Sequence, residues 1–233
     1  MAALQGCSIV WQKRRVEELS NEQTDRQGVV TLSAQQRRYQ REGTRLRGLA
    51  LLALTFLFGA FSDSFAADEA SLWRALASRN HFAVMRHAIA PGAGDPREFT
   101  IGDCRTQRNL SDAGRRQACS LGQRFRENGI RSARIYSSQW CRSKETAALL
   151  GLGSVTEMPA LNSFFQSPDR GPRQTQALKS WLADQELIGP VVLVTHQVNI
   201  TALTSLYTAP GELVVMRRGQ DGKMSAVGTI VVD

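Results

Sequence analysis

The stretch Val191-Val192-Leu193-Val194-Thr195-His196 contains the most apolar run of strand length outside the N-terminal third of the chain. Four consecutive β-branched or leucine residues bounded by Gly189-Pro190 predict a short strand that is buried on both faces. Such a strand is typical of the centre of a parallel sheet. The polar pair Thr195-His196 follows where the strand ends, so the sheet and a candidate site are predicted from one segment.

Outward from this strand, apolar runs of strand length alternate with stretches of helical periodicity. Further strands are predicted at 82–85, 134–136, 213–216 and 227–232, the last two near a sheet edge, and helices at 68–78, 111–129, 143–150, 175–187 and 200–207. Alternation at this spacing predicts an α/β domain with a largely parallel sheet.

Polar groups follow all three inner strands. The first strand leads into Arg86-His87, the second into Ser137-Ser138 with Arg142 one turn on, and the third into Thr195-His196. Carboxyl ends of parallel strands meet at one sheet edge, where helix N-termini present free N–H groups. We therefore expect two histidines and two arginines around one space, which suits a phosphoryl group.

The chemistry of these residue types supports this expectation. A neutral imidazole is a competent nucleophile near pH 7 and can form a phosphohistidine, whose P–N bond is more easily hydrolysed than the ester. Arginines offer forked donors to the phosphoryl oxygens, and each charge-assisted hydrogen bond contributes about 1.5 to 3 kcal/mol. Arg105 and Arg108, in the loop after His87, either line this pocket or belong to an ordinary solvated loop.

Four segments, in this order, resemble the histidine phosphatase superfamily, which has the phosphoglycerate mutase-like fold. They are Met85-Arg86-His87-Ala88, Asn109-Leu110-Ser111-Asp112-Ala113-Gly114-Arg115-Arg116-Gln117-Ala118, Tyr136-Ser137-Ser138-Gln139-Trp140-Cys141-Arg142-Ser143-Lys144-Glu145-Thr146-Ala147 and Val194-Thr195-His196-Gln197-Val198-Asn199-Ile200. The resemblance covers residues 80–205. It implies a three-layer α/β/α domain with a mostly parallel central sheet, and His87 as the phosphorylated nucleophile. It also implies that Arg86, Arg142 and His196 bind the phosphate, without a metal or cofactor.

The sequence departs from the family at the proton donor. One branch has a glutamate about 20 residues beyond the second arginine motif, where this chain reads Leu161-Asn162-Ser163-Phe164-Phe165; the other has an aspartate after the second histidine, where this chain has Gln197. A general acid contributes roughly 10² to 10⁴ in rate. Three acids in the loop after His87 are candidates for this role: Asp95, Glu98 and Asp103.

The first third of the chain has the pattern of an exported protein. Residues 1–44 are polar and are expected to be a disordered extension, with a translation start near Val29, Val30 or Leu32 as one hypothesis. Residues 45–66 have a basic flank, an apolar run and small residues at Ser64 and Ala66, which predict a signal peptide cleaved after Ala66. The alternative is a membrane anchor through residues 49–65.

Export would place residues 67–233, the predicted histidine phosphatase domain, in the periplasm or outside the cell, without stable membrane insertion after cleavage. In such an oxidising compartment Cys104, after the active-site loop, and Cys141, beside Arg142, are a possible disulfide pair, though spacing alone leaves the pairing open.

The net charge of +8 favours anionic partners. No basic helix interleaved with aromatic residues occurs, which argues against nucleic acid. The expected activity is hydrolysis of a phosphomonoester, either a small molecule or a glycolipid of the envelope. Two alternatives stay open: a catalytically weak phosphate-binding module that has lost its acid, and a phosphohistidine-protein phosphatase, which would require a cytosolic partner.

Overall fold

The computed structural model describes residues 68–231, so the predictions for 1–44 and 45–66 lie outside the described residues. The helices are α2 (Glu69–Leu76), α3 (Asp112–Glu127), α4 (Cys141–Leu149), α5 (Gly171–Asp184) and α6 (Gln197–Thr204), with short 3₁₀ turns η2 (Cys104–Thr106), η3 (Pro159–Leu161) and η4 (Pro168–Arg170). The strands are β1 (His81–Arg86), β2 (Arg134–Ser137), β3 (Val155–Glu157), β4 (Val191–Thr195), β5 (Leu213–Arg218) and β6 (Met224–Ile230).

The six strands form one sheet in the order β3-β2-β4-β1-β5-β6. β2 pairs in parallel with β3 and β4, β4 pairs in parallel with β1, and β5 pairs antiparallel with both β1 and β6. Only β5 therefore runs against the others, and the prediction of a mostly parallel α/β sheet is confirmed. β4, the most apolar strand, lies between β1 and β2 with every residue buried, as expected for a central strand.

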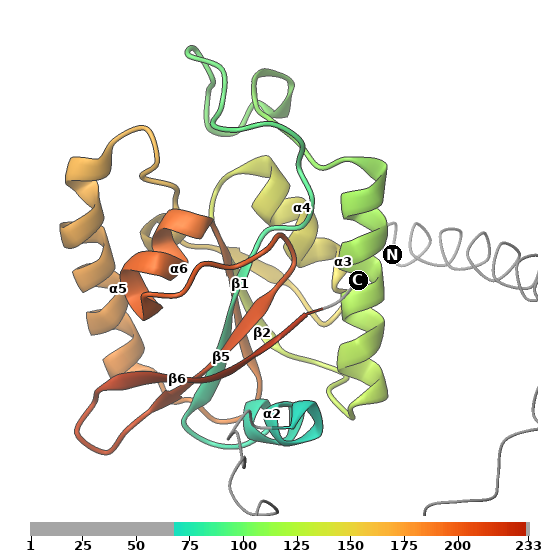
Figure 1. Cartoon of the computed structure of the whole chain (residues 1–233), viewed down its shortest axis with the longest axis vertical. Helices are drawn as coiled ribbons and strands as arrows, with labels where there is room; N and C mark the ends of the chain where they lie inside the picture. Colours follow the sequence, from blue (N-terminus) through green and yellow to red (C-terminus); the bar gives the residue numbers. More distant parts are fainter. Residues whose placement is uncertain (1–67, 232–233) are drawn as a thin grey trace, which may run out of the picture. The chain divides into compact units, whose positions relative to one another are not determined.

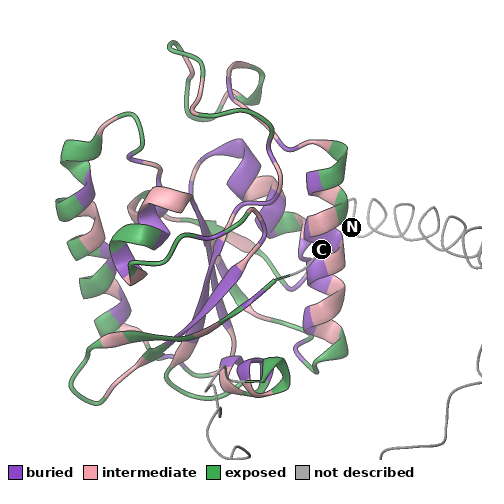
Figure 2. Ribbon diagram, in the orientation of Figure 1, coloured by how far each residue is buried: buried purple, intermediate pink, exposed green. Residues whose placement is uncertain are grey.

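Two apolar clusters fill the spaces on the two faces of the sheet. Alternate residues of β1 point to opposite faces, so Ala83 and Met85 join one cluster while Phe82 and Val84 join the other. Helices α2, α3 and α4 cover the first face, and α5 and α6 cover the second (Figure 1). The central strands are buried, while the outer faces of the helices remain exposed (Figure 2). Residues 68–231 form a three-layer α/β/α structure.

The helix boundaries follow local chemistry. Ser111 caps α3, because its side chain accepts a hydrogen bond from the backbone N–H of Gly114. α5 begins at Gly171, four residues before the predicted start. Pro172 lies in its first turn, where a missing N–H costs nothing, so the Gly-Pro pair starts this helix instead of marking a turn.

Candidate active site

The three polar strand ends meet at one edge of the sheet. Arg86 pairs with Thr195 in the β1–β4 register, and the backbone N–H of His87 donates to the Thr195 carbonyl at 3.0 Å. On the other side of β4, the N–H of Ser138 donates to the Val194 carbonyl at 3.0 Å. The predicted site residues on these strands are therefore neighbours because the strands are neighbours.

The two histidines lie side by side in the interior. The ring centroids of His87 and His196 are 5.4 Å apart, and each residue is only 3% exposed. The sequence predicted that these side chains would meet, and the structure brings them together. Trp140 packs edge-on against His196 with centroids 5.4 Å apart, which closes this side of the pair.

The hydrogen bonds of His87 define which ring nitrogen carries the hydrogen and which carries the lone pair. Its Nδ1 lies 2.8 Å from the Ala88 carbonyl, which can only accept, so Nδ1 carries the hydrogen. Its Nε2 therefore has a lone pair, and Arg142 Nε donates to it at 3.2 Å. Burial and the charge of Arg142 lower the pKa of His87 to about 3, although the Ala88 carbonyl acts in the opposite direction. The imidazole is thus neutral at physiological pH, and Nε2 is the ring nitrogen that carries the lone pair.

His196 is also held neutral. Its Nε2 lies 2.8 Å from Ser138 Oγ and 3.4 Å from Ser143 Oγ. Burial, and then the neighbouring His87 and Arg142, hold the pKa of His196 well below its ordinary value. His196 therefore acts as a polar neutral group, and it does not supply the positive charge that a protonated imidazole would add.

Arg142 forms hydrogen bonds both to His87 and to the loop that follows His87. The residue is 2% exposed and sits in the first turn of α4. Its Nε contacts His87, while Nη1 and Nη2 donate to the two carboxylate oxygens of Asp95 at 2.7 and 3.0 Å. Nη1 also donates to the Arg108 carbonyl at 3.2 Å. The guanidinium fork is therefore already engaged by an anion from this chain.

Of the three candidate acids, only Asp95 reaches this centre. Burial alone would raise the pKa of Asp95, but the hydrogen bonds from Arg142 and Trp140 outweigh it and hold the pKa below its ordinary value. Glu98 is exposed, and Asp103 forms an ion pair with Arg105, whose side chain is 90% exposed. The structure thus does not bring Glu98 and Asp103 to the histidines, and it holds Asp95 as a carboxylate.

A third arginine also acts on the site. The side chain of Arg108 is half-buried, donates from Nε to the Gly94 carbonyl at 2.7 Å, and lowers the pKa of both histidines by its charge. Burial and the nearby Arg142 lower the pKa of Arg108 itself, although Asp95 acts in the opposite direction. Of the two loop arginines whose place the sequence left open, Arg108 therefore lies at the site and Arg105 in solvent.

Arg86 is tied to the far side of the site. Its Nη1 donates to the Thr208 carbonyl at 2.9 Å, and Gln197 accepts hydrogen bonds from the Thr208 N–H and hydroxyl at 3.0 Å each. Gln197, which stands where one branch of the family has an aspartate, thus fixes the loop that positions Arg86. Within residues 68–231, Arg86 Nε is one of two buried side-chain polar atoms with no hydrogen-bond partner, the other being Asn199 Oδ1.

A disulfide joins Cys104 and Cys141, with the Cα atoms 5.6 Å apart. This is the pair that the sequence left open. Gln107 reinforces the connection, because its side chain accepts a hydrogen bond from the Cys141 N–H at 3.0 Å. The loop after His87 is therefore attached directly to the start of α4, next to Arg142.

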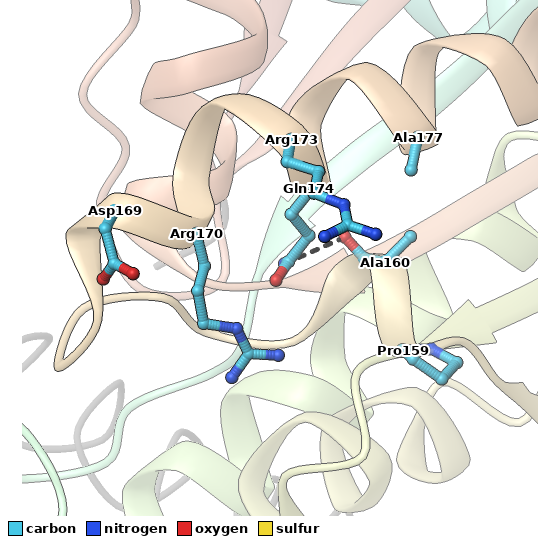
Figure 3. Close-up of a pocket in the computed structure, with 7 residues that line it drawn as sticks. All are labelled: Pro159, Ala160, Asp169, Arg170, Arg173, Gln174 and Ala177. Carbon is cyan, nitrogen blue, oxygen red and sulfur yellow. Dashed lines mark hydrogen bonds between the residues drawn. The ribbon is translucent and has the colours of Figure 1, made fainter.

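A separate hollow lies between η3 and the first turns of α5 (Figure 3). Seven residues line it: Pro159, Ala160, Asp169, Arg170, Arg173, Gln174 and Ala177. The two arginines are exposed, and Gln174 donates to the Ala160 carbonyl at 3.2 Å. None of the predicted site residues lines this hollow.

In the described part of the chain, no cluster of histidine, cysteine, aspartate and glutamate has the make-up of a metal site.

Residues 83–165 match the model of the histidine phosphatase superfamily, branch 1. The match spans 83 of the 233 residues of the chain. The matched segment contains His87 and Arg142, and the recognition made from the sequence motifs is confirmed. His196 lies beyond the matched segment and is placed beside His87 by the fold. A comparison with curated proteins gave no match.

Solved histidine phosphatases have similar folds at low identity. A putative α-ribazole-5′-P phosphatase from Escherichia coli is 14% identical with a TM-score of 0.49, covering 66% of this chain and 98% of its own. The protein histidine phosphatase SixA, complexed with tungstate, is 14% identical with a TM-score of 0.46, covering 64% and 96%. A mycobacterial glucosyl-3-phosphoglycerate phosphatase is 17% identical with a TM-score of 0.46, covering 63% and 96%. Similarity at this level carries no conclusion on the activity or the substrate of this chain.

Proposed function

We propose that the chain is a phosphomonoester hydrolase that works through a phosphohistidine on His87 without a metal ion. Arg86, Arg142 and His196 hold the phosphoryl group. His87 Nε2 attacks phosphorus, the ester P–O bond breaks, and the leaving oxygen takes a proton and departs as the alcohol. Water then attacks the phosphohistidine and gives up a proton, which balances the one taken by the alcohol, while the P–N bond breaks and its electron pair returns to Nε2.

The charge at the site supports binding of a phosphate dianion. Arg86, Arg108 and Arg142 all act electrostatically on His87, both histidines are neutral, and Asp95 is the carboxylate paired with Arg142. Three positive charges and one negative charge leave an excess of two. The buried Nε of Arg86 has no partner in the described structure, and an unsatisfied buried donor costs about 1 to 3 kcal/mol or more when charged. A phosphate oxygen would satisfy it.

The single observation that carries the proposal is that the lone pair of the neutral His87 is on Nε2, where it faces a buried guanidinium. The test is steady release of p-nitrophenol from p-nitrophenyl phosphate by the full chain. His87→Ala is expected to abolish turnover. His81→Ala is the matched control, because His81 bonds only to Ser78 and the Arg79 carbonyl and lies at the other end of β1. Undiminished turnover by His87→Ala would overturn the proposal.

The substrate is proposed to be a phosphate ester outside the cytosol, either a small molecule or an envelope glycolipid. The basis is the signal-peptide pattern of residues 45–66 with cleavage after Ala66. Within residues 68–231, no helix is long and apolar enough to cross a membrane. Cell fractionation with N-terminal sequencing tests the location. Recovery of an unprocessed chain in the cytosol would favour the phosphohistidine-protein phosphatase alternative, and recovery in the membrane would favour an anchor at 49–65.

A phosphate-binding module is the competing function. It is favoured by the engagement of Arg142 with Asp95 and His87, which leaves the fork occupied, and by the lack of an acid at either customary position. The two functions differ in turnover. A module would bind inorganic phosphate and release less than one equivalent of p-nitrophenol per chain, whereas a phosphatase would release many.

A further inference from the structure

Asp95 occupies the kind of position that a phosphoryl group needs. Its carboxylate accepts hydrogen bonds from Arg142 Nη1 and Nη2, from Trp140 Nε1 at 3.0 Å and from the Arg108 N–H at 3.2 Å. The Asp95 side chain is only 4% exposed. A guanidinium fork binds carboxylate and phosphate in the same bidentate geometry. The four donors therefore form an anion site that this chain fills with its own carboxylate.

The nucleophile is engaged in the same arrangement. Arg142 Nε donates to His87 Nε2, so the lone pair that would attack phosphorus is accepting a hydrogen bond. His87 and Arg142 are 3% and 2% exposed. A phosphoryl group can contact both His87 and Arg142 only if it replaces the Asp95 carboxylate and accepts the hydrogen bonds of the Arg142 guanidinium.

The segment that carries Asp95 is suited to such an exchange. Asp95 is in a loop between β1 and α3, at the upper edge of the sheet in Figure 1. Gly92 and Gly94 have φ values of +91° and +66°, which side-chain-bearing residues rarely adopt. Side chains hold the loop: Arg108 Nε donates to the Gly94 carbonyl, and Gln166 donates to the Asp95 carbonyl at 3.1 Å. No strand pairing has to break for Asp95 to withdraw.

We propose that substrate phosphate displaces Asp95 from Arg142 and that Asp95 then donates the proton to the leaving oxygen. This inference rests on the proposed phosphatase function and names the missing acid. Displacement removes a cation from Asp95 and places a phosphoryl anion beside it, and both changes favour the protonated carboxyl. The disulfide at Cys104, nine residues on, keeps the loop attached beside the site.

The proton balance closes over one turnover. The Asp95 carboxylate takes a proton from water when phosphate displaces it from Arg142, and it returns that proton to water when the product leaves and the carboxylate binds Arg142 again. In the first step the P–N bond to His87 Nε2 forms, the ester P–O bond breaks, and the leaving oxygen takes the proton of Asp95. In the second step the Asp95 carboxylate takes a proton from water, the hydroxide oxygen bonds to phosphorus, and the P–N bond breaks. Asp95 is then protonated again, and the net reaction is ester plus water to alcohol plus phosphate.

The first experiment measures Asp95→Asn in the full chain with two substrates. An alkyl phosphate, β-glycerophosphate, needs a protonated leaving group, while p-nitrophenyl phosphate releases a stable phenolate. We expect kcat to fall about 10² to 10³-fold for the alkyl ester and less than about tenfold for the aryl ester. Inhibition by inorganic phosphate should strengthen several-fold, since no carboxylate competes for Arg142. Equal losses on both substrates, or weaker phosphate inhibition, would overturn the proposal.

Two comparison variants separate this acid from its neighbours. Glu98→Gln removes an exposed carboxylate of the same loop, and the same dependence on the leaving group in this variant would also overturn the assignment. Asp221→Asn, in the exposed turn between β5 and β6 at the other end of the sheet, should match the wild type. His87→Ala shows which proposal has failed. If this variant keeps its activity, the proposed function is wrong. If it is inactive while Asp95→Asn loses both substrates equally, only the assignment of the acid is wrong.

A second measurement needs no change at Asp95. Trp140 Nε1 donates to Asp95 Oδ2, so displacement of the carboxylate should change the fluorescence of this tryptophan. Inorganic phosphate added to the wild-type chain should give a saturable change that is absent in Trp140→Phe. Phosphate that inhibits hydrolysis without changing the fluorescence would contradict the displacement.

Discussion

Arg142 donates from Nε to His87 Nε2 across 3.2 Å, while its two Nη atoms hold the carboxylate of Asp95. One buried side chain therefore contacts both the proposed nucleophile and the carboxylate of Asp95. The forked shape of the guanidinium makes this possible, because the N–H groups of Nε and of the two Nη atoms lie in one plane and point in different directions within it. The site depends on that geometry as well as on the charge of Arg142.

Arg142→Lys keeps the charge and removes the fork. A lysine ammonium is a point charge and cannot hold two oxygens bidentately while contacting His87. Loss of one or two charge-assisted hydrogen bonds, at about 1.5 to 3 kcal/mol each, predicts that kcat/KM falls at least about tenfold. Steady-state kinetics with p-nitrophenyl phosphate measures this. Arg105→Lys, at a 90% exposed side chain, is the control, and an equal effect there would contradict the role of the fork.

The buried neutral histidines predict loss of stability in mild acid. The folded pKa of His87 is about 3 against 6.5 for the free group, so between these pH values the unfolded chain binds a proton that the folded chain does not. Stability is therefore complete above about pH 6.5 and falls as the pH decreases, by up to about 1.4 kcal/mol per pH unit for this histidine. Urea unfolding of the wild type and His87→Gln at pH 7.5, 6.0 and 5.0 measures the slopes. Equal slopes in the two proteins would contradict the burial of a neutral His87.

The Cys104–Cys141 disulfide is expected to stabilise the fold by restricting the unfolded chain. Its sequence separation of 37 residues corresponds to roughly 4 kcal/mol in the chain-entropy treatment. Replacing both cysteines with alanine should lower the free energy of unfolding by up to about this amount, and reducing agent should then have no effect through this pair. Non-reducing peptide mapping checks the bond, and alkylation of Cys104 without a reductant would show that it is absent.

Gly114 lets α3 closely approach the backbone of Ile89, in the segment that follows His87. A Cβ added there would lie 2.1 Å from the Ile89 carbonyl oxygen, a distance that the backbone could accommodate only by moving. Gly114→Ala should therefore destabilise the chain by about 1 to 3 kcal/mol and lower kcat by displacing the residues after His87. Thermal unfolding and kinetics check both effects. Arg116→Ala, two residues on and exposed, should change neither the stability nor kcat. A Gly114→Ala chain with unchanged stability and kcat would contradict the close approach.

Much of the fold could be predicted from local patterns. β1, β2 and β4 are short strands that lead into polar residues, and they lie in the parallel part of the sheet as the alternation of strands and helices predicts. β3 was not predicted, because Val155-Thr156-Glu157 is too short and polar to show a period. The start of α5 was placed too late, because Gly171-Pro172 has the composition of a turn as well as of a helix start.

The site was predictable where strands position it and not where a loop does. His87 and His196 each follow a strand, so the sheet register brings them together. Asp95 and Arg142 are 47 residues apart, and their contact depends on an irregular loop whose path no sequence period describes. The same loop decides that Arg108 turns inward and Arg105 outward. This is why three acids remained equivalent in the sequence and only one of them contacts the site.

The most direct test of the phosphatase account is to identify the phosphorylated residue. The full chain is mixed with p-nitrophenyl phosphate, quenched rapidly in alkali where phosphohistidine survives, digested and mapped by mass spectrometry. The account predicts one phosphoryl group on the peptide that contains His87, and none in the His87→Ala chain. A phosphoryl group on a different residue, or turnover that persists in His87→Ala, would contradict it.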